Sequence, residues 1–523
     1  MRLPPGVNSK DFSDALKQFA EAVGREWVFT SDEDLDPYRD SYSPVWNEEE
    51  EPIPSAAVAP DGVEQIQAVV RIANKYKIPL WTISTGKNLG YGASAPLLGG
   101  SVVLDLKRMN RVLEINEKNH TVLLEPGVSY FDLYRYIQEH KLKLWIDPPD
   151  PGWGSLVGNS LERGGGYTPM HDHFDAVCGM EVVLPNGEVM RTGMGAMPEA
   201  KTWQQYKYGF GPYVTGIFSQ SSLGIVTKMG VWLLPEPEAF QAGIVMGWKH
   251  NDLIPLVDIY AELQNSGIIR CTTTLSSSFW LGPPNPELDA LHASGSTKDM
   301  EDYAARKNLP YWSFPLYFYG PAKVVAAQWE HAKERFSTIP GVTFLEGPSY
   351  RFPLSAEEIS KIRDTVPLGI PSLQIFTLLP PRSEGHIGFS PIIPMSGEAM
   401  LEAMAVFDRV HRELGTGRAV MTVLSSFARS FVIIDLFPVE KNVESNRKTR
   451  EIYRRLIKEA AAHGWGEYRT HTTFMGDISN TYSFNNHVLR RFHETIKDAV
   501  DPNGILSPGK CGIWPKRMRK AEA

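Results

Sequence analysis

The sequence contains little cysteine, no long apolar run and no concentration of positive charge. Its three cysteines, Cys178, Cys271 and Cys511, are odd in number and widely spaced, which argues against a disulfide framework and fits a reducing compartment. No apolar run approaches the roughly 18–20 residues that a membrane helix needs, and the N-terminus has no apolar segment of signal-peptide length. The net charge is −8 and the basic residues are scattered, unlike a surface that binds nucleic acid. We therefore expect a cytoplasmic protein with neither membrane nor nucleic acid as a partner.

The length and composition indicate a globular protein with more than one domain. A chain of 523 residues is too long for one compact core, and its 42% hydrophobic and 22% charged residues are ordinary proportions. Short strand patterns alternate with helix patterns between residues 55 and 145. Asp61, for example, can cap a helix whose apolar residues recur at helical spacing, namely Ile66, Val69, Val70 and Ala73. Short strands without a long parallel series predict an α+β fold.

Later segments add a hairpin, four long helices and a returning tail. Asn186 and Gly187 separate two strand patterns and predict a tight hairpin turn in which both residues take positive φ angles. Long helical patterns lie near residues 252–265, 321–337, 395–414 and 440–463. The tail from Pro502 to Lys510 has the glycine- and proline-rich composition of the first half, so we expect it to fold back onto that half.

Two glycine-rich loops predict a binding site. The loop 84–92 follows a strand pattern, and successive backbone N–H groups in such a loop can converge on an anion. It matches neither the GxGxxG fingerprint nor the Walker loop, so alone it also fits a simple turn-rich connection. The second loop covers residues 149–159 and continues into residues 163–169. Long irregular loops in a compact domain are usually functional.

Two short motifs carry the chemistry. His386 lies among the glycines of the segment 385–391, where a flat group can approach the backbone. Tyr468 and Arg469 place a phenol beside a guanidinium. A histidine that carries a flavin, together with a cation that holds a phenolate, would make an oxidase of para-substituted phenols. A hydrogen-bonded histidine and a structural Tyr–Arg pair are the alternatives. The run 171–173, His-Asp-His, does not predict a metal site, because adjacent ligands rarely close one and no distant cluster accompanies them.

Together these motifs resemble the vanillyl-alcohol oxidase and eugenol oxidase family. They stand in the order of that family and cover nearly the whole chain. The resemblance is carried by the segments Thr85–Gly92, Pro149–Gly152, Gly158–Asn159, Gly385–Pro391, Gly466–His471 and Asn503–Lys510.

The resemblance implies an α+β fold with a two-part FAD-binding domain of the p-cresol methylhydroxylase type and an α+β cap domain. Residues 1–238 would form the FAD-binding domain, 239–467 the cap, or substrate, domain, and 468–523 the return to the FAD-binding domain. A covalent bond from His386 to the flavin would withdraw electrons from the ring and favour hydride acceptance. The other residues implied in FAD binding are Ser84, Thr85, Gly86, Lys87, Asn88, Gly90, Gly158, Asn159 and Lys510.

The resemblance also implies the catalytic residues. Tyr91, Tyr468 and Arg469 would hold the phenolic oxygen as an anion, which eases hydride loss from the benzylic carbon and yields a p-quinone methide. Asp150 would stabilise the reacting centre near the flavin and then act as base for water addition, with a plain turn aspartate as the alternative. The substrate pocket would be lined by Tyr167, Gly165, Gly388 and Ser390.

The implied activity is FAD-dependent oxidation of substrates such as vanillyl alcohol, eugenol or 4-alkylphenols, with O₂ reduced to H₂O₂. In the related cresol dehydrogenases a tyrosine carries the flavin and a cytochrome takes the electrons, so His386 favours the oxidase and leaves the dehydrogenase as the alternative. The expected partners are a small phenolic substrate and O₂, and the expected assembly is a homodimer or a larger homo-oligomer.

The chain departs from the family pattern in two places. Fungal members carry a second histidine in the N-terminal segment that assists flavin attachment, and residues 40–54 contain none, so the group that activates His386 is open. Gly165 stands where eugenol oxidase-like chains carry a valine. The missing side chain should widen the pocket beside the ring, so we expect tolerance of bulky ortho groups, including the two methoxy groups of syringyl phenols.

Overall fold

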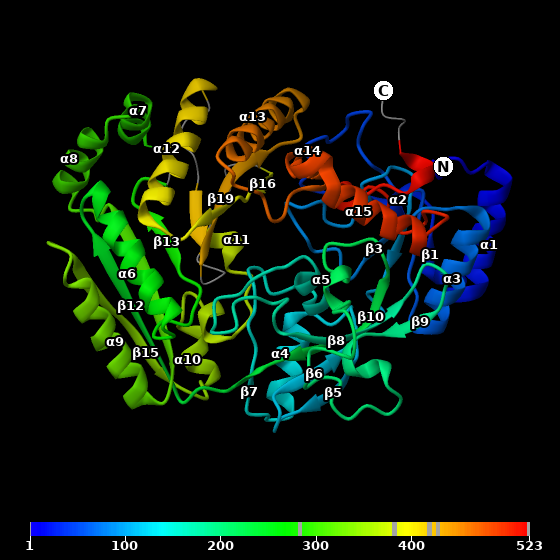
Figure 1. The fold of residues 1–523 in the computed structure, drawn as a ribbon, viewed down its shortest axis with the longest axis horizontal. Helices are drawn as coiled ribbons and strands as arrows, with labels where there is room; N and C mark the ends of the chain where they lie inside the picture. Colours follow the sequence, from blue (N-terminus) through cyan, green and yellow to red (C-terminus); the bar gives the residue numbers. More distant parts are fainter. Residues whose placement is uncertain (1, 281–284, 379–383, 416–420, 425–428, 520–523) are drawn as a thin grey trace.

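Three large β-sheets form the framework of the protein (Figure 1). The computed structural model describes residues 2–280, 285–378, 384–415, 421–424 and 429–519. The first sheet has four strands in the order β1 (Val28–Phe29), β2 (Ala56–Val58), β4 (Val102–Asp105) and β3 (Leu80–Ile83). The second is antiparallel, in the order β5 (Val112–Asn116), β6 (Thr121–Leu124), β10 (Ile225–Trp232), β8 (Val177–Val183) and β9 (Val189–Arg191).

The third sheet is antiparallel and forms the opposite end of the molecule (Figure 1). Its path is β15 (Thr343–Arg351), β12 (Ala239–Gly247), β14 (Trp312–Gly320), β13 (Thr274–Ser277), β18 (Met421–Leu424), β19 (Ser430–Val439) and β16 (Gly385–Phe389). The strand β17 (Ile392–Pro394) also pairs with β19. A small separate ladder joins β7 (Leu144–Trp145) to β11 (Leu234–Pro235).

Helices cover the outer faces of these sheets. A core beside the first sheet includes residues of α1 (Ser9–Val23) and α3 (Val63–Tyr76). A larger core beside the third sheet includes residues of α6 (Leu253–Asn265), α9 (Ala322–Phe336), α12 (Gly397–Glu413) and α13 (Val443–Ala462). The remaining helices are α2 (Asp32–Leu35), α4 (Tyr130–Glu139), α5 (Leu156–Leu161), α7 (Pro286–Ser294), α8 (Thr297–Lys307), α10 (Ala356–Ser360), α11 (Ile375–Leu378), α14 (Met475–Thr481) and α15 (Phe484–Val500). No helix in the described ranges is both long and apolar enough to cross a bilayer.

This arrangement confirms the predicted α+β fold class. The four long helical patterns correspond to α6, α9, α12 and α13. The apolar residues predicted to face the core of α3 are all fully buried, because a period of 3.6 residues brings them onto one side of the helix. The helices that the sequence predicts are therefore those in which apolar residues recur most regularly at helical spacing.

Two local predictions are wrong. Asp61 does not cap α3, whose N-cap residue is Gly62 without a side-chain bond, because the Asp61 carboxylate accepts a hydrogen bond from Arg108 at 2.8 Å. The β8–β9 hairpin exists, but only Gly187 in its turn has a positive φ, +86°. Pro185 fixes a negative φ at the start of the turn. The result is a three-residue loop closed by Leu184 N–H to the Glu188 carbonyl at 2.8 Å.

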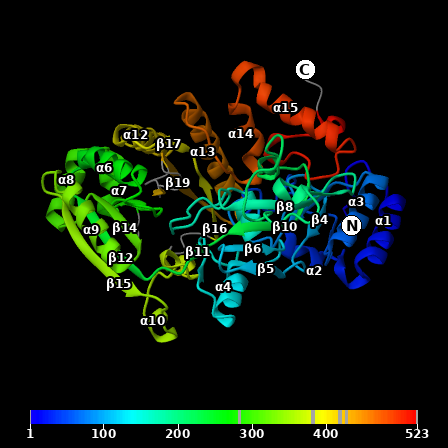
Figure 2. The same ribbon diagram turned by 60° about the horizontal axis from the view of Figure 1, so that its bottom comes forward.

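The C-terminal segment runs beside the first sheet. The Leu80 N–H donates to the Ile505 carbonyl and the Ser507 N–H donates to the Leu80 carbonyl, each at 2.7 Å. In both views α15 lies at the same end of the molecule as α1 and α3, away from the third sheet (Figures 1 and 2). The space between the two ends is bounded by β3, its following loop, β16 and the segment 468–472.

Candidate active site

A cavity of about 1250 Å³ lies between the first two sheets and the third. It is larger than the roughly 300–1,000 Å³ of an ordinary small-ligand pocket, so it has room for a large cofactor and a substrate together. All but one of the predicted site residues line it: Ser84, Thr85, Gly86, Lys87, Asn88, Gly90, Tyr91, Asp150, Gly158, Asn159, Gly165, Tyr167, His386, Gly388, Tyr468, Arg469 and Lys510.

Ser390 is the exception. It is fully buried and is not among the described residues that line the cavity. Its backbone N–H donates to the Glu467 carboxyl at 3.0 Å. Side chains alternate in direction along a strand, but β16 ends at Phe389, before Ser390. The next residue, Pro391, pairs with Glu467 instead. The structure therefore moves Ser390 from the predicted pocket wall to the layer behind it.

The loop after β3 reaches the His386 strand because Gly90 has no side chain. Gly90 has a φ of +79°, and a Cβ there would lie 3.0 Å from the His386 carbonyl oxygen. Both the conformation and the close approach favour glycine. The loop thus forms one wall of the cavity while it touches the strand that carries His386.

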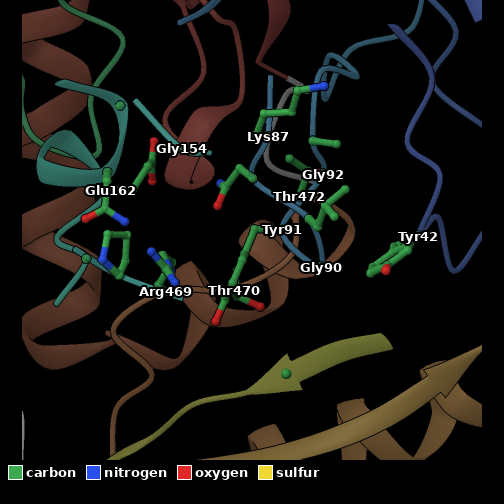
Figure 3. Close-up of a pocket in the computed structure, with 18 of the residues that line it drawn as sticks. Tyr42, Lys87, Gly90, Tyr91, Gly92, Gly154, Glu162, Arg469, Thr470 and Thr472 are labelled. Atoms are coloured by element: carbon green, nitrogen blue, oxygen red, sulfur yellow. The ribbon is translucent and has the colours of Figure 1, made fainter. Parts of the chain in front are cut away.

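Arg469 is a cation that lines the cavity beside two phenol rings. Its guanidinium lies 4.0 Å from the centre of the Tyr91 ring and 5.6 Å from that of Tyr468. Figure 3 shows Arg469 and Tyr91 close together in the cavity. Burial opposes the charge of Arg469, but the Tyr468 and Tyr91 hydroxyls more than offset this effect and hold the pKa of Arg469 above its ordinary value. Burial also raises the pKa of Tyr468 to about 12, although Arg469 opposes that shift.

The Nε atom of Arg469 has no hydrogen-bond partner in the described part of the chain. A buried guanidinium donor without an acceptor is costly. The cavity therefore presents an unsatisfied cation beside two phenol rings, which is a suitable arrangement for an anionic oxygen.

Asp150 lies in a separate, acidic part of the same cavity. Burial, with the nearby Asp364, raises the pKa of Asp150 to about 6, against a hydrogen bond from Tyr167 that lowers it. Asp364 also lines the cavity, and burial raises its pKa as well. The loop that carries Asp150 is also hydrogen-bonded to the segment that follows Asp364, since the Gly152 N–H donates to the Ser372 carbonyl at 2.9 Å. A carboxyl with this pKa can change its charge near neutral pH.

His386 faces the cavity from β16. Burial lowers its pKa, so its imidazole is neutral at neutral pH, and the ring of Tyr42 lies 5.3 Å away between centroids. Tyr42 also lines the cavity and stands apart from the Arg469–Tyr91 pair in Figure 3. The Tyr42 N–H donates to Asp40, which in turn accepts from His471 at 2.7 Å. These buried groups connect the N-terminal segment to the His386 strand.

The cavity also contains groups suited to a cofactor with phosphates. Lys510 forms an ion pair with Glu162 at 2.5 Å, and both residues line the cavity. Ser222 lines it as well, and its buried hydroxyl has no partner in the described residues. A Cβ at Gly158 would lie 2.4 Å from the Ser84 hydroxyl, so glycine there keeps the two loop walls together. These features fit the predicted FAD groove.

Sequence reasoning missed Tyr42, Glu162 and Asp364 as residues of this site, and Glu467 as a buried carboxyl behind it. Tyr42, Glu162 and Asp364 line the cavity from segments whose local patterns indicated no function. Glu467 was visible within the motif 466–471, but nothing in the sequence distinguished a buried carboxyl from an exposed one.

Two family profiles match the chain. The one described as "FAD binding domain" matches residues 54–193, and the one described as "FAD linked oxidases, C-terminal domain" matches residues 384–511. These segments include the Ser84 loop and the His386 strand. The chain therefore contains an FAD-binding domain.

Three known proteins match this chain over nearly its whole length and over nearly the whole of their own. The 4-cresol dehydrogenase (hydroxylating) flavoprotein subunit of Pseudomonas putida is 35% identical over 98% of this chain and 97% of that protein. The structure of 4-ethylphenol oxidase from Gulosibacter chungangensis in complex with isoeugenol is 35% identical, with a TM-score of 0.86, over 99% of this chain and 100% of that one. Substrate-bound p-cresol methylhydroxylase is 33% identical, with a TM-score of 0.87, over 98% and 99%.

Proposed function

Because the chain belongs to the p-cresol methylhydroxylase and vanillyl-alcohol oxidase family of flavoproteins, we propose that it is an FAD-dependent oxidase of para-substituted phenols. The observation that carries this proposal is the buried Arg469 guanidinium between two tyrosine rings in the cavity. Glu162 lies near enough to favour the charge of Arg469 but forms no ion pair with it in the described residues, and a phenolate is an anion that also fits beside aromatic rings.

Arg469, Tyr91 and Tyr468 hold the ring oxygen of the substrate. A free phenol has a pKa of about 10, and each unit by which the site lowers it corresponds to about 1.4 kcal/mol of preferential binding to the anion. Arginine suits this position because it keeps its charge when it is desolvated. Tyr468 remains a protonated donor, since burial raises its pKa to about 12.

Asp150 and Tyr167 serve the other end of the substrate. The carboxylate of Asp150, on the same cavity wall as Tyr167, stabilises positive charge at the benzylic carbon and takes a proton from the water that adds there. A pKa of about 6 leaves Asp150 ionised at neutral pH but still basic enough to accept that proton. Benzylic alcohols would give aldehydes, and 4-alkylphenols would give alcohols or alkenylphenols.

The loop 84–90, Gly158, Asn159 and Lys510 would hold FAD along the cavity, with His386 as its covalent tether. Bound FAD supplies the two-electron acceptor for benzylic oxidation and returns the electrons to O₂ as H₂O₂. The neutral imidazole of His386 keeps the lone pair that such a tether requires. Gly90 lets this loop approach the backbone of the histidine, since a Cβ there would lie 3.0 Å from the His386 carbonyl oxygen.

The alternative is a dehydrogenase that passes electrons to a cytochrome. The Pseudomonas putida relative is named as the flavoprotein subunit of a dehydrogenase. The two functions differ in the fate of the electrons. We expect the purified protein to produce one H₂O₂ for each 4-ethylphenol consumed in air. An enzyme whose reduced flavin is stable in air and is reoxidised only by a one-electron acceptor would overturn the oxidase proposal in favour of the dehydrogenase.

A further inference from the structure

Glu467 is a buried carboxyl directly behind the Tyr468–Arg469 pair. Its residue is 5% exposed, and its Oε1 atom accepts the Ser390 N–H at 3.0 Å and the Tyr453 hydroxyl at 2.7 Å. The backbone of this segment also pairs with residue 391, just beyond the end of β16. The side chain and the backbone of residue 467 thus join the phenolate-binding segment to the strand that carries His386.

Tyr453 extends this junction to α13. Its hydroxyl lies 2.9 Å from the Gly388 carbonyl oxygen and 2.8 Å from the Thr470 hydroxyl, in addition to its bond to Glu467. Its ring stacks on Phe474 at 4.0 Å between centroids and is fully buried. One hydroxyl therefore contacts β16 and both sides of Tyr468 and Arg469. The position of Arg469 relative to His386 depends on these bonds.

The surroundings of Glu467 do not suit a negative charge. In the described part of the chain, its Oε2 atom has no hydrogen-bond partner. Three phenols interact with it: Tyr453 from α13, Tyr468 from its own segment and Tyr482 from the end of α14. Burial raises the pKa of Glu467 to about 8, against the lowering effects of Tyr453, Ser390 and Thr470. A protonated Oε2 leaves one hydroxyl unsatisfied, whereas an ionised one leaves a buried charge unpaired, which costs more.

We propose that Glu467 is a positioning residue that acts as an uncharged acid, holding Tyr468 and Arg469 against the His386 strand while adding no negative charge beside the bound phenolate. The second half of this inference rests on the proposed function. If Glu467 ionises, it places a negative charge next to the residues that stabilise the anion. Activity should therefore fall as the pH rises through about 8.

Glu467→Gln separates the charge from the hydrogen bonds. The amide oxygen can accept the same two bonds, but the side chain cannot ionise. We expect kcat/KM for 4-ethylphenol within about threefold of wild type at pH 7, without the decline above pH 8 that wild type shows. Glu467→Leu, of similar size, removes the acceptor and should lose more than about tenfold at pH 7, because the Ser390 N–H and the Tyr453 hydroxyl lose their partner. A Gln variant as impaired as the Leu variant, or one with the wild-type profile above pH 8, would overturn the inference.

A second measurement needs no substrate. The infrared difference spectrum of wild type minus Glu467→Gln at pH 7 should contain the C=O band of a protonated carboxylic acid, and this band should disappear as the pH rises through about 8. Asp150 and Asp364 are present in both proteins and cancel. Absence of the band at pH 7 refutes the uncharged acid whatever the substrate is. Its presence in a protein that turns over no 4-alkylphenol supports the uncharged acid and counts instead against the proposed function.

Discussion

Replacing Arg469 tests the phenolate site most directly. Arg469→Met keeps the length of the side chain but removes the guanidinium, which lies 4.0 Å from the centre of the Tyr91 ring. The ring oxygen of the substrate then has no cation beside it. Removing one partner of a buried charge pair costs about 3–5 kcal/mol. Since about 1.4 kcal/mol is a factor of ten, we expect kcat/KM for 4-ethylphenol to fall roughly 200- to 5,000-fold. Arg469→Lys keeps the charge but loses the planar fork and the ring contact, so its loss should be about 10- to 100-fold.

The assay is anaerobic reduction of the bound flavin by 4-ethylphenol, followed by stopped-flow absorbance. With Arg469→Met, the rate should rise from pH 7 to pH 9, because ionisation in solution then supplies the anion that the site no longer stabilises. Arg455→Met is a matched control, since Arg455 is 46% exposed and pairs with Glu459 on the surface of α13. It should leave the rate unchanged. Near-wild-type reduction in Arg469→Met, or reduction by 4-ethylanisole, whose ring oxygen cannot ionise, would refute the phenolate mechanism.

Three further predictions concern the tether, the base and the pocket. Acid precipitation of wild type should give a yellow fluorescent pellet, and His386→Ala should release its FAD to the supernatant; flavin retained by the variant contradicts the tether. Burial and Asp364 raise the pKa of Asp150 to about 6, so a base at this position gains its working charge as pH rises through about 6. In Asp150→Asn, the fall of kcat/KM toward acid pH should disappear, and the rate should drop about 10²- to 10⁴-fold. A fall that persists in the variant would belong to another group. Gly165→Val should lower activity on 4-propylsyringol relative to 4-propylguaiacol, and an unchanged ratio would show that residue 165 does not set this preference.

The sequence predicts those parts of the fold in which the local pattern matches the tertiary environment. α3 is such a case, because its spacing of apolar residues is also its pattern of burial. Its N-terminus was predicted wrongly because a contact 47 residues away, from Arg108, competes for the Asp61 carboxylate. The β8–β9 turn failed for a local reason, since Pro185 has no N–H to close a two-residue Asn-Gly turn, and the Leu184 N–H donates to the Glu188 carbonyl instead.

The residues of the candidate site also divide into those that the sequence predicts and those that it does not. Residues within short motifs, such as Gly90 and Arg469, could be named from the sequence because glycine and arginine each supply a property that few other residues have. Tyr42 and Asp364 could not, because their proximity to His386 and Asp150 results from how distant segments pack. Ser390 was predicted on the pocket wall, but it lies buried behind that wall, where its backbone N–H donates to Glu467.

The distribution of charge in the cavity suggests why its carboxyls are buried. Asp150 and Asp364 line the part of the cavity away from the place proposed for an anion and Glu467 lies behind that place, whereas Arg469 is a cation beside the two phenol rings. Three ionised carboxylates would oppose the binding of a phenolate. Burial raises the pKa of each of them, and most strongly that of Glu467, the acid closest in sequence to Arg469. If the proposed mechanism holds, Glu467 would be uncharged near neutral pH behind the place where the ring oxygen is held, and Asp150 would supply a carboxylate at the carbon that becomes electron-poor. The same desolvation that would strengthen an Arg469–phenolate interaction would thus also remove a negative charge that competes with it.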